Sequence, residues 1–130
     1  MGSLRANGLI VRRAVCLASV ASILVGFTAA DEEKARQGAH QLKAIYWQCL
    51  ADVTQRQLTR AMSTEDFSIF IKGVCLAEEQ NFRVAVVDYL AMKFPEISTG
   101  THLAEADRLV SLAQVDVVST YIDLKSKPTQ

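Results

Sequence analysis

The chain has 130 residues, half of them hydrophobic, with fourteen basic and fourteen acidic side chains. A chain this short excludes most multi-domain enzymes, and its apolar content excludes a disordered tail. Its zero net charge excludes a nucleic-acid binder that works by bulk charge, and its two prolines and six glycines exclude a collagen-like or linker-like chain.

Residues 1–30 have the three-part pattern of a cleaved secretory signal peptide. They contain no acidic residue, their basic head includes Arg12 and Arg13, and residues 14–27 are apolar or small. The small residues that follow predict cleavage after Ala30. A retained membrane anchor is the alternative, although residues 14–30 are shorter than the roughly 20 apolar residues that such an anchor uses. We therefore expect an exported protein. The bacterial periplasm is the favoured compartment, and secretion is the alternative.

Residues 31–127 are expected to form a single helical domain, and residues 128–130 a C-terminal tail. Without the three arginines of the leader, this part of the chain has eleven basic and fourteen acidic residues, a net charge of −3. A mildly acidic domain has no electrostatic reason to bind nucleic acid or an anionic membrane. We therefore expect neither a nucleic-acid partner nor a stable membrane association after cleavage.

Apolar residues at steps of three and four predict two long helices, over residues 32–62 and 64–94. Ser63, followed three residues later by Asp66, resembles a capping box at the start of the second helix. Pro95 predicts the end of this helix, because a residue that precedes proline disfavours the α conformation. The two helices are expected to form an antiparallel hairpin.

Cys49 and Cys75 are the cysteines that remain after the leader, and we expect them to form a disulfide. Two cysteines in an exported domain indicate one bridge, and two buried free thiols are the alternative. Both lie on apolar faces, and their positions are symmetric about the turn near residue 62, so they face each other across the hairpin. By the loop-entropy model, such a bridge stabilises the fold by about 3–4 kcal/mol.

A third helix is predicted over residues 101–125. Residues 115–122 are rich in β-formers, but they lie within a longer helical pattern and no partner strand is predicted, so a helix is favoured. The predicted fold is therefore all-α, a three-helix bundle built on the disulfide-linked antiparallel helical hairpin.

Glu78 interrupts the apolar stripe of the second helix, and Tyr46 is the residue expected to face it. A hydrogen bond would satisfy both groups, since an unpaired buried carboxylate costs several kcal/mol. We expect either this buried polar pair, which would fix the helix register, or a Glu78 that reaches the rim of the core. The alternative is a proton-donating carboxyl at a pocket. Glu79 and Arg83 are expected to form an ion pair on the solvated face.

Trp47, Val115, Val118 and Ile122 form the candidate interaction surface. Trp47 lies on the flank of its helix, where it either packs under the third helix or acts as a contact hot spot. The other three form a second stripe on the third helix that a three-helix bundle cannot easily bury. Either the linker wraps this stripe or another molecule, such as a second copy, covers it.

No catalytic motif or cofactor-binding motif occurs, and His40 and His102 lack metal-ligand spacing, so no metal site is expected. We therefore expect a small, non-catalytic, protein-binding module, such as an inhibitor, an envelope adaptor or a chaperone-like protein. The alternative is a small periplasmic hydrolase or lyase with Glu78 as its acid.

Overall fold

The computed structural model describes residues 26–60 and 62–127, and every regular element in this part of the chain is helical. The all-α prediction is confirmed. The second predicted helix, however, is divided in two, so the described residues contain one α-helix more than the predicted three-helix bundle. The elements are α1 (Ala29–Leu58), α2 (Thr64–Phe70), the 3-10 turn η1 (Ile71–Gly73), α3 (Leu76–Lys93) and α4 (Thr99–Ser126).

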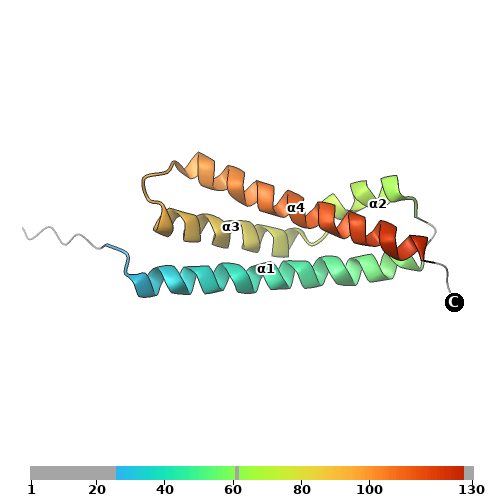
Figure 1. Ribbon diagram of the computed structural model, residues 1–130, viewed down its shortest axis with the longest axis horizontal. Coiled ribbons are helices and arrows are strands. Elements are labelled where there is room, and N and C mark those ends of the chain that lie inside the picture. Colours follow the sequence, from blue (N-terminus) through green and yellow to red (C-terminus); the bar gives the residue numbers. More distant parts are fainter. Residues whose placement is uncertain (1–25, 61, 128–130) are drawn as a thin grey trace, which may run out of the picture.

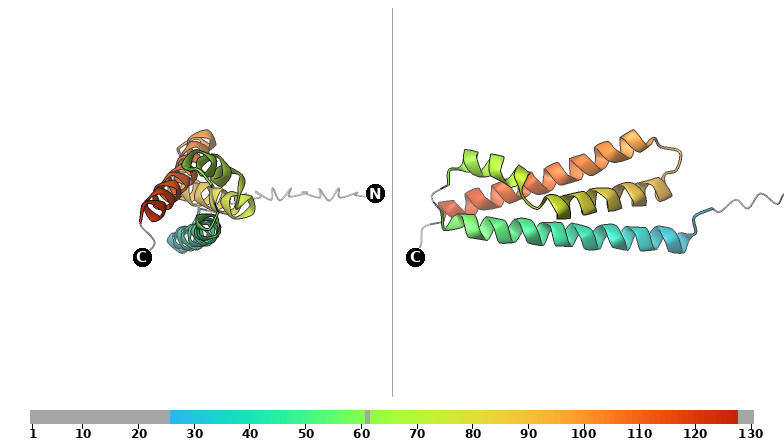
Figure 2. Two further views of the ribbon diagram at one scale, coloured as in Figure 1. Left: turned by 90° about the vertical axis from the view of Figure 1, so that its right-hand side faces the viewer. Right: turned by 180° about the vertical axis from the view of Figure 1, so that it is seen from behind.

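Helices α1, α3 and α4 lie lengthwise beside one another (Figure 1). Helices α1 and α4 run in the same direction, and α3 runs in the opposite direction and packs against both. Helix α2 lies against the C-terminal half of α4, as the further views also show (Figure 2). Helix α3 therefore covers one half of the molecule, and α2 with η1 covers the other half.

The interruption of the second predicted helix lies at Val74 and Cys75. Cys75 has φ 56° and ψ 32°, in the left-handed region, and is the N-cap residue of α3. A side chain in this region costs about 1–2 kcal/mol, and a right-handed helix does not continue through it. Helical periodicity at the sequence level gives no signal for such a residue, because Cys75 falls on the apolar stripe in either case.

The interruption also rotates the face that α3 buries. The buried residues of α3 are Glu79, Phe82 and Val86. The predicted stripe, which ran without interruption from Ile71 to Ala85, placed Glu78 near its middle instead. An offset of one residue corresponds to about 100° around a helix, so it decides which of two adjacent carboxylates faces the core.

Hydroxyl side chains begin three of the described helices. Thr28, Ser63 and Ser98 are the N-cap residues of α1, α2 and α4, and each side chain accepts a hydrogen bond from a backbone N–H of the first turn. At α2 this bond joins the Asp66 N–H to Ser63 at 3.0 Å, which confirms the cap predicted there. Residues 115–122 lie within α4, as expected despite their β-forming composition.

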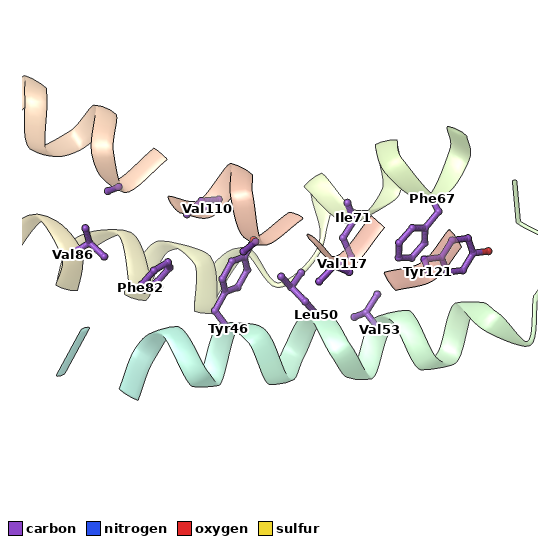
Figure 3. Close-up of a cluster of buried hydrophobic side chains, with 12 residues drawn as sticks. Tyr46, Leu50, Val53, Phe67, Ile71, Phe82, Val86, Val110, Val117 and Tyr121 are labelled. Atoms are coloured by element: carbon purple, nitrogen blue, oxygen red, sulfur yellow. The ribbon is translucent and has the colours of Figure 1, made fainter. Parts of the chain in front are cut away.

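One cluster of buried apolar side chains joins all of the elements (Figure 3). The rings of Phe67 and Tyr121 stack with centroids 3.9 Å apart, which holds α2 on α4. The rings of Tyr46 and Phe82, on α1 and α3, lie 6.1 Å apart. Each helix buries one face in this cluster, so loss of any one helix would expose the apolar faces of the remaining helices to water. The cluster consists of Tyr46, Leu50, Val53, Phe67, Ile71, Phe82, Val86, Ala106, Val110, Ala113, Val117 and Tyr121.

The predicted leader lies almost entirely outside the described residues. The predicted cleavage point after Ala30 falls in the first turn of α1. None of the helices in residues 26–60 and 62–127 has the length and apolar character needed to cross a membrane.

Candidate functional site

A groove of about 340 Å³ runs between α1 and α4, over α3. Helix α3 contributes Phe82, Val86 and Leu90 to its lining. Trp47 on α1 and Leu112 on α4 line its two sides. The groove is thus an apolar depression with an aromatic side chain at its edge. Apolar and aromatic side chains of this kind usually line binding sites.

The two edges of the groove have opposite charges. Arg36, His40 and Lys43 lie along the α1 edge, and Glu105 and Asp116 lie along the α4 edge. We call the apolar lining together with these two edges the α1/α4 face. Such a face combines apolar contact area with charges that can orient a ligand.

One basic and one acidic group on the α1/α4 face are already paired within the chain. Arg36 donates to Glu33 at 2.6 Å, and Arg108 donates to Glu105 at 2.6 Å. The pairing with Arg36 lowers the pKa of Glu33 to about 2. Lys43 and Asp116 form no ion pair with any described residue, so these two charges remain available to a ligand.

A second, wider hollow of about 550 Å³ lies between α1 and α3 on the other side of α1. Its lining includes Ala35, Gly38 and Ala85, together with Gly26 and Phe27. Cleavage after Ala30 would remove Gly26 and Phe27, so the shape of this hollow depends on the leader. The α1/α4 face does not depend on any residue of the leader.

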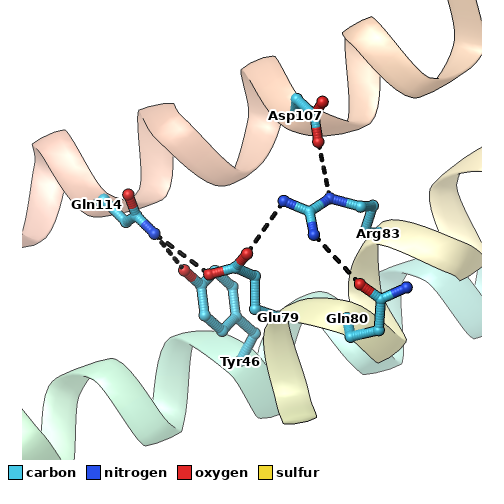
Figure 4. Close-up of polar contacts among 6 residues, drawn as sticks. All are labelled: Tyr46, Glu79, Gln80, Arg83, Asp107 and Gln114. Atoms are coloured by element: carbon cyan, nitrogen blue, oxygen red, sulfur yellow. Dashed lines mark hydrogen bonds and ion pairs between the residues drawn. The ribbon is translucent and has the colours of Figure 1, made fainter. Parts of the chain in front are cut away.

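A polar network joins α1, α3 and α4 inside the bundle (Figure 4). Gln114 donates to the Tyr46 hydroxyl and to Glu79, each at 3.3 Å. Arg83 donates to the other carboxylate oxygen of Glu79 at 3.0 Å and to Asp107 at 2.7 Å. Burial raises the pKa of the Tyr46 hydroxyl above its usual value. The network satisfies polar groups that the packing would otherwise leave unpaired.

The structure gives Tyr46 a different partner from the predicted one. The Tyr46 hydroxyl bonds to Gln114, and Glu79 rather than Glu78 is the carboxylate of the network. The ion pair between Glu79 and Arg83 forms as expected, but Glu79 is only 9% exposed, so the prediction of a solvated position is wrong for Glu79. The physical reason is the change of helical phase at Cys75.

Glu78 lies partly buried beside Cys49 and Cys75, whose Sγ atoms are 2.04 Å apart, at disulfide distance. A carboxylate oxygen of Glu78 and the two Sγ atoms lie within 4.8 Å of one another. Sulfur atoms bonded to each other are not thiolates, however, so they are poor ligands for a metal. Glu78 lines neither of the two hollows described above.

The predicted interaction surface is only partly exposed. Trp47 and Val118 are half-buried and pack against the core, whereas Val115 and Ile122 are 60% and 44% exposed. The linker between α3 and α4 does not cover these two side chains. Trp47 also lines the groove together with α4, so packing and ligand contact are both open to it.

The sequence did not identify Gln114 or the groove. Gln114 directly follows Ala113, which belongs to the buried stripe of α4. This position next to the stripe was the only local signal that Gln114 could join a buried network. The groove has no local signal, because it depends on how far α1 and α4 diverge over α3. His102 is buried with its Nε2 unpartnered, and His40 lies at the edge of the groove.

No family model, curated protein or solved structure matches the chain. The functional assignment therefore rests on its own residues.

Proposed function

We propose that this protein is exported and non-catalytic, and that it binds another polypeptide at the α1/α4 face. The observation that carries the proposal is the combination of an apolar groove with Trp47 at its side and unpaired charges, Lys43 and Asp116, on opposite edges. Aromatic side chains in a desolvated depression contribute most of the binding energy at protein interfaces, and charges at the rim set specificity. An inhibitor, an adaptor or a chaperone-like protein would each use such a face.

Export is supported by the leader pattern and by the position of two cysteines at disulfide distance. Disulfides persist in oxidising compartments and are rare in a reducing cytosol. We propose the bacterial periplasm as the compartment, with secretion as the alternative. Mass spectrometry of the purified protein should find Asp31 as the first residue, and a retained leader would contradict this part of the proposal.

A catalytic function with Glu78 as the acid has no observation in its favour. Glu78 lies beside the paired cysteines and lines neither hollow, and among the described residues it forms no ion pair with a base. We therefore do not propose a hydrolase or a lyase.

The binding function can be tested by site-specific photo-crosslinking in the export compartment. A photoreactive residue in place of Leu112, on the groove, should form an adduct of defined mass with a polypeptide. The same residue in place of Val84, which is exposed on α3 and does not line the groove, is the matched control. The adduct should form only at Leu112 and should be lost in Trp47→Ala. Adducts of equal yield at both positions, or no adduct at Leu112, would contradict the proposal.

A further inference from the structure

We infer that the polypeptide bound at the α1/α4 face is a second copy of this chain, docked face to face so that α4 of each copy lies along the α1 edge of the other copy's groove. This inference rests on the proposed function and names its partner. Two observations carry it: the groove shares Leu112 with a row of exposed apolar side chains on α4, and the charges on its edges are self-complementary.

The apolar ridge consists of Leu112, Val115 and Ile122 on α4, which are 45%, 60% and 44% exposed. Leu112 belongs both to this ridge and to the groove lining. One copy therefore offers a depression and, directly beside it, a protruding apolar helix. A face of this kind is self-complementary under two-fold symmetry, because each copy supplies both an apolar depression and exposed apolar side chains that can cover the same face of the other. Exposed apolar side chains in solution are unfavourable, so their burial between the two copies stabilises the pair.

The charges on the two edges select the direction of the two-fold axis. The cations are on α1 and the unpaired acid Asp116 is on α4, and these two helices run in the same direction. An axis parallel to α4 places the acidic edge of one copy opposite the basic edge of the other, so Lys43 faces Asp116 of the second copy. An axis that lies in the interface but runs perpendicular to α4 would place α1 opposite α1, so the cations of the two copies would face each other. The first arrangement pairs the two charges that are unpaired within a single chain.

The wild-type protein purified from the export compartment should therefore dimerise in sedimentation velocity measurements over a wide concentration range. Lys43→Glu and Asp116→Lys should each raise the dimer Kd at least about tenfold, because like charges then face each other at two symmetry-related positions. The double variant Lys43→Glu/Asp116→Lys should restore the wild-type Kd, since it exchanges the charges across the interface. Lys72→Glu, on η1 and away from the α1/α4 face, is the control for charge reversal and should leave the Kd unchanged.

Circular dichroism should show the same helical content in all four variants, because each altered side chain is exposed and forms no ion pair. A monomer at every concentration overturns the inference, as does a dimer that the double variant fails to restore. If the wild-type protein is monomeric but Leu112 still forms a crosslink to another polypeptide, then the second copy is excluded and the proposed function stands. If neither occurs, both are overturned.

Discussion

Glu79 is a buried carboxylate whose two oxygens accept hydrogen bonds from two different helices. Arg83 donates from one turn further along α3, and Gln114 donates from α4. Gln114 also reaches Tyr46, so one carboxylate connects α1, α3 and α4 through neighbouring polar groups. A satisfied network of this kind favours one packing arrangement over its alternatives, because any shift of a helix leaves a buried polar group without a partner.

Replacement of Glu79 by alanine should therefore destabilise the fold by about 1–3 kcal/mol, since the Gln114 amide and the Arg83 guanidinium each lose one of their hydrogen-bond acceptors. Glu78→Ala is the matched control and should change the free energy of unfolding by less than about 0.5 kcal/mol. Urea unfolding monitored by circular dichroism measures both changes. A larger loss for Glu78→Ala than for Glu79→Ala would contradict the register of α3 described here.

Tyr46 makes the stability depend on pH at the alkaline end. Burial raises the pKa of its hydroxyl above the usual value of 10.0, so the folded protein holds this proton more tightly than the unfolded chain does. Its contribution to stability is complete below pH 10 and is lost as the pH rises through the raised pKa. The free energy of unfolding should therefore fall with pH above this point, more steeply than in Tyr46→Phe. Equal slopes in the two proteins would show that Tyr46 ionises normally.

The segment between α2 and α3 shows how one residue can end an element. Cys75 has a left-handed backbone and is also the residue whose Sγ lies at disulfide distance from Cys49. The start of α3 is thus held against the middle of α1 at a position where the helix itself cannot continue. No side-chain hydrogen bond caps this helix start.

The double variant Cys49→Ala/Cys75→Ala should lose about 3–4 kcal/mol of stability, the loop-entropy value for cysteines separated by 26 residues. Its helical content should stay close to that of the wild type, because the buried cluster does not depend on the sulfur atoms. Addition of a reductant should lower the stability of the wild-type protein to that of the variant and leave the variant unchanged. An unchanged wild-type stability under reducing conditions would argue against the bridge.

At the scale of the whole molecule, the described residues of the predicted leader, 26–30, contribute nothing to the buried cluster. The buried part of α1 begins at Ala39, whereas the capping box of Thr28 and Asp31 lies at the very start of the helix. Hydrogen bonds from the backbone and side chain of Thr28 lower the pKa of Asp31. Removal of residues 1–30 deletes this cap and leaves the core contacts in place.

A chain that begins at Asp31 should therefore fold with nearly unchanged global stability, within about 1 kcal/mol, since only the terminal turn of α1 loses its cap. Amide hydrogen exchange should accelerate in residues 32–36 relative to a chain that begins at Gly26. Protection from Ala39 onwards should be the same in both chains. A loss of protection throughout α1 would show that the leader contributes to the core.

Local patterns in the sequence predicted the long first and last helices, the cap at Ser63 and the proximity of Cys49 and Cys75, but not the division of the second helix. These features depend on neighbouring residues or on the symmetry of a hairpin, and both can be read without coordinates. The same patterns predicted an all-α fold and a Trp47 at the flank of α1. The exported location and the binding role remain predictions.

Only the tertiary structure decided which carboxylate is buried, because a single left-handed residue at Cys75 rotates α3 and periodicity assumes an uninterrupted helix. It also brought Gln114 to Tyr46, which are far apart in sequence, and opened the groove beside Trp47 by the divergence of α1 and α4. These features arise from the angles at which helices pack. Many residues set those angles jointly, and no local stretch of sequence encodes them.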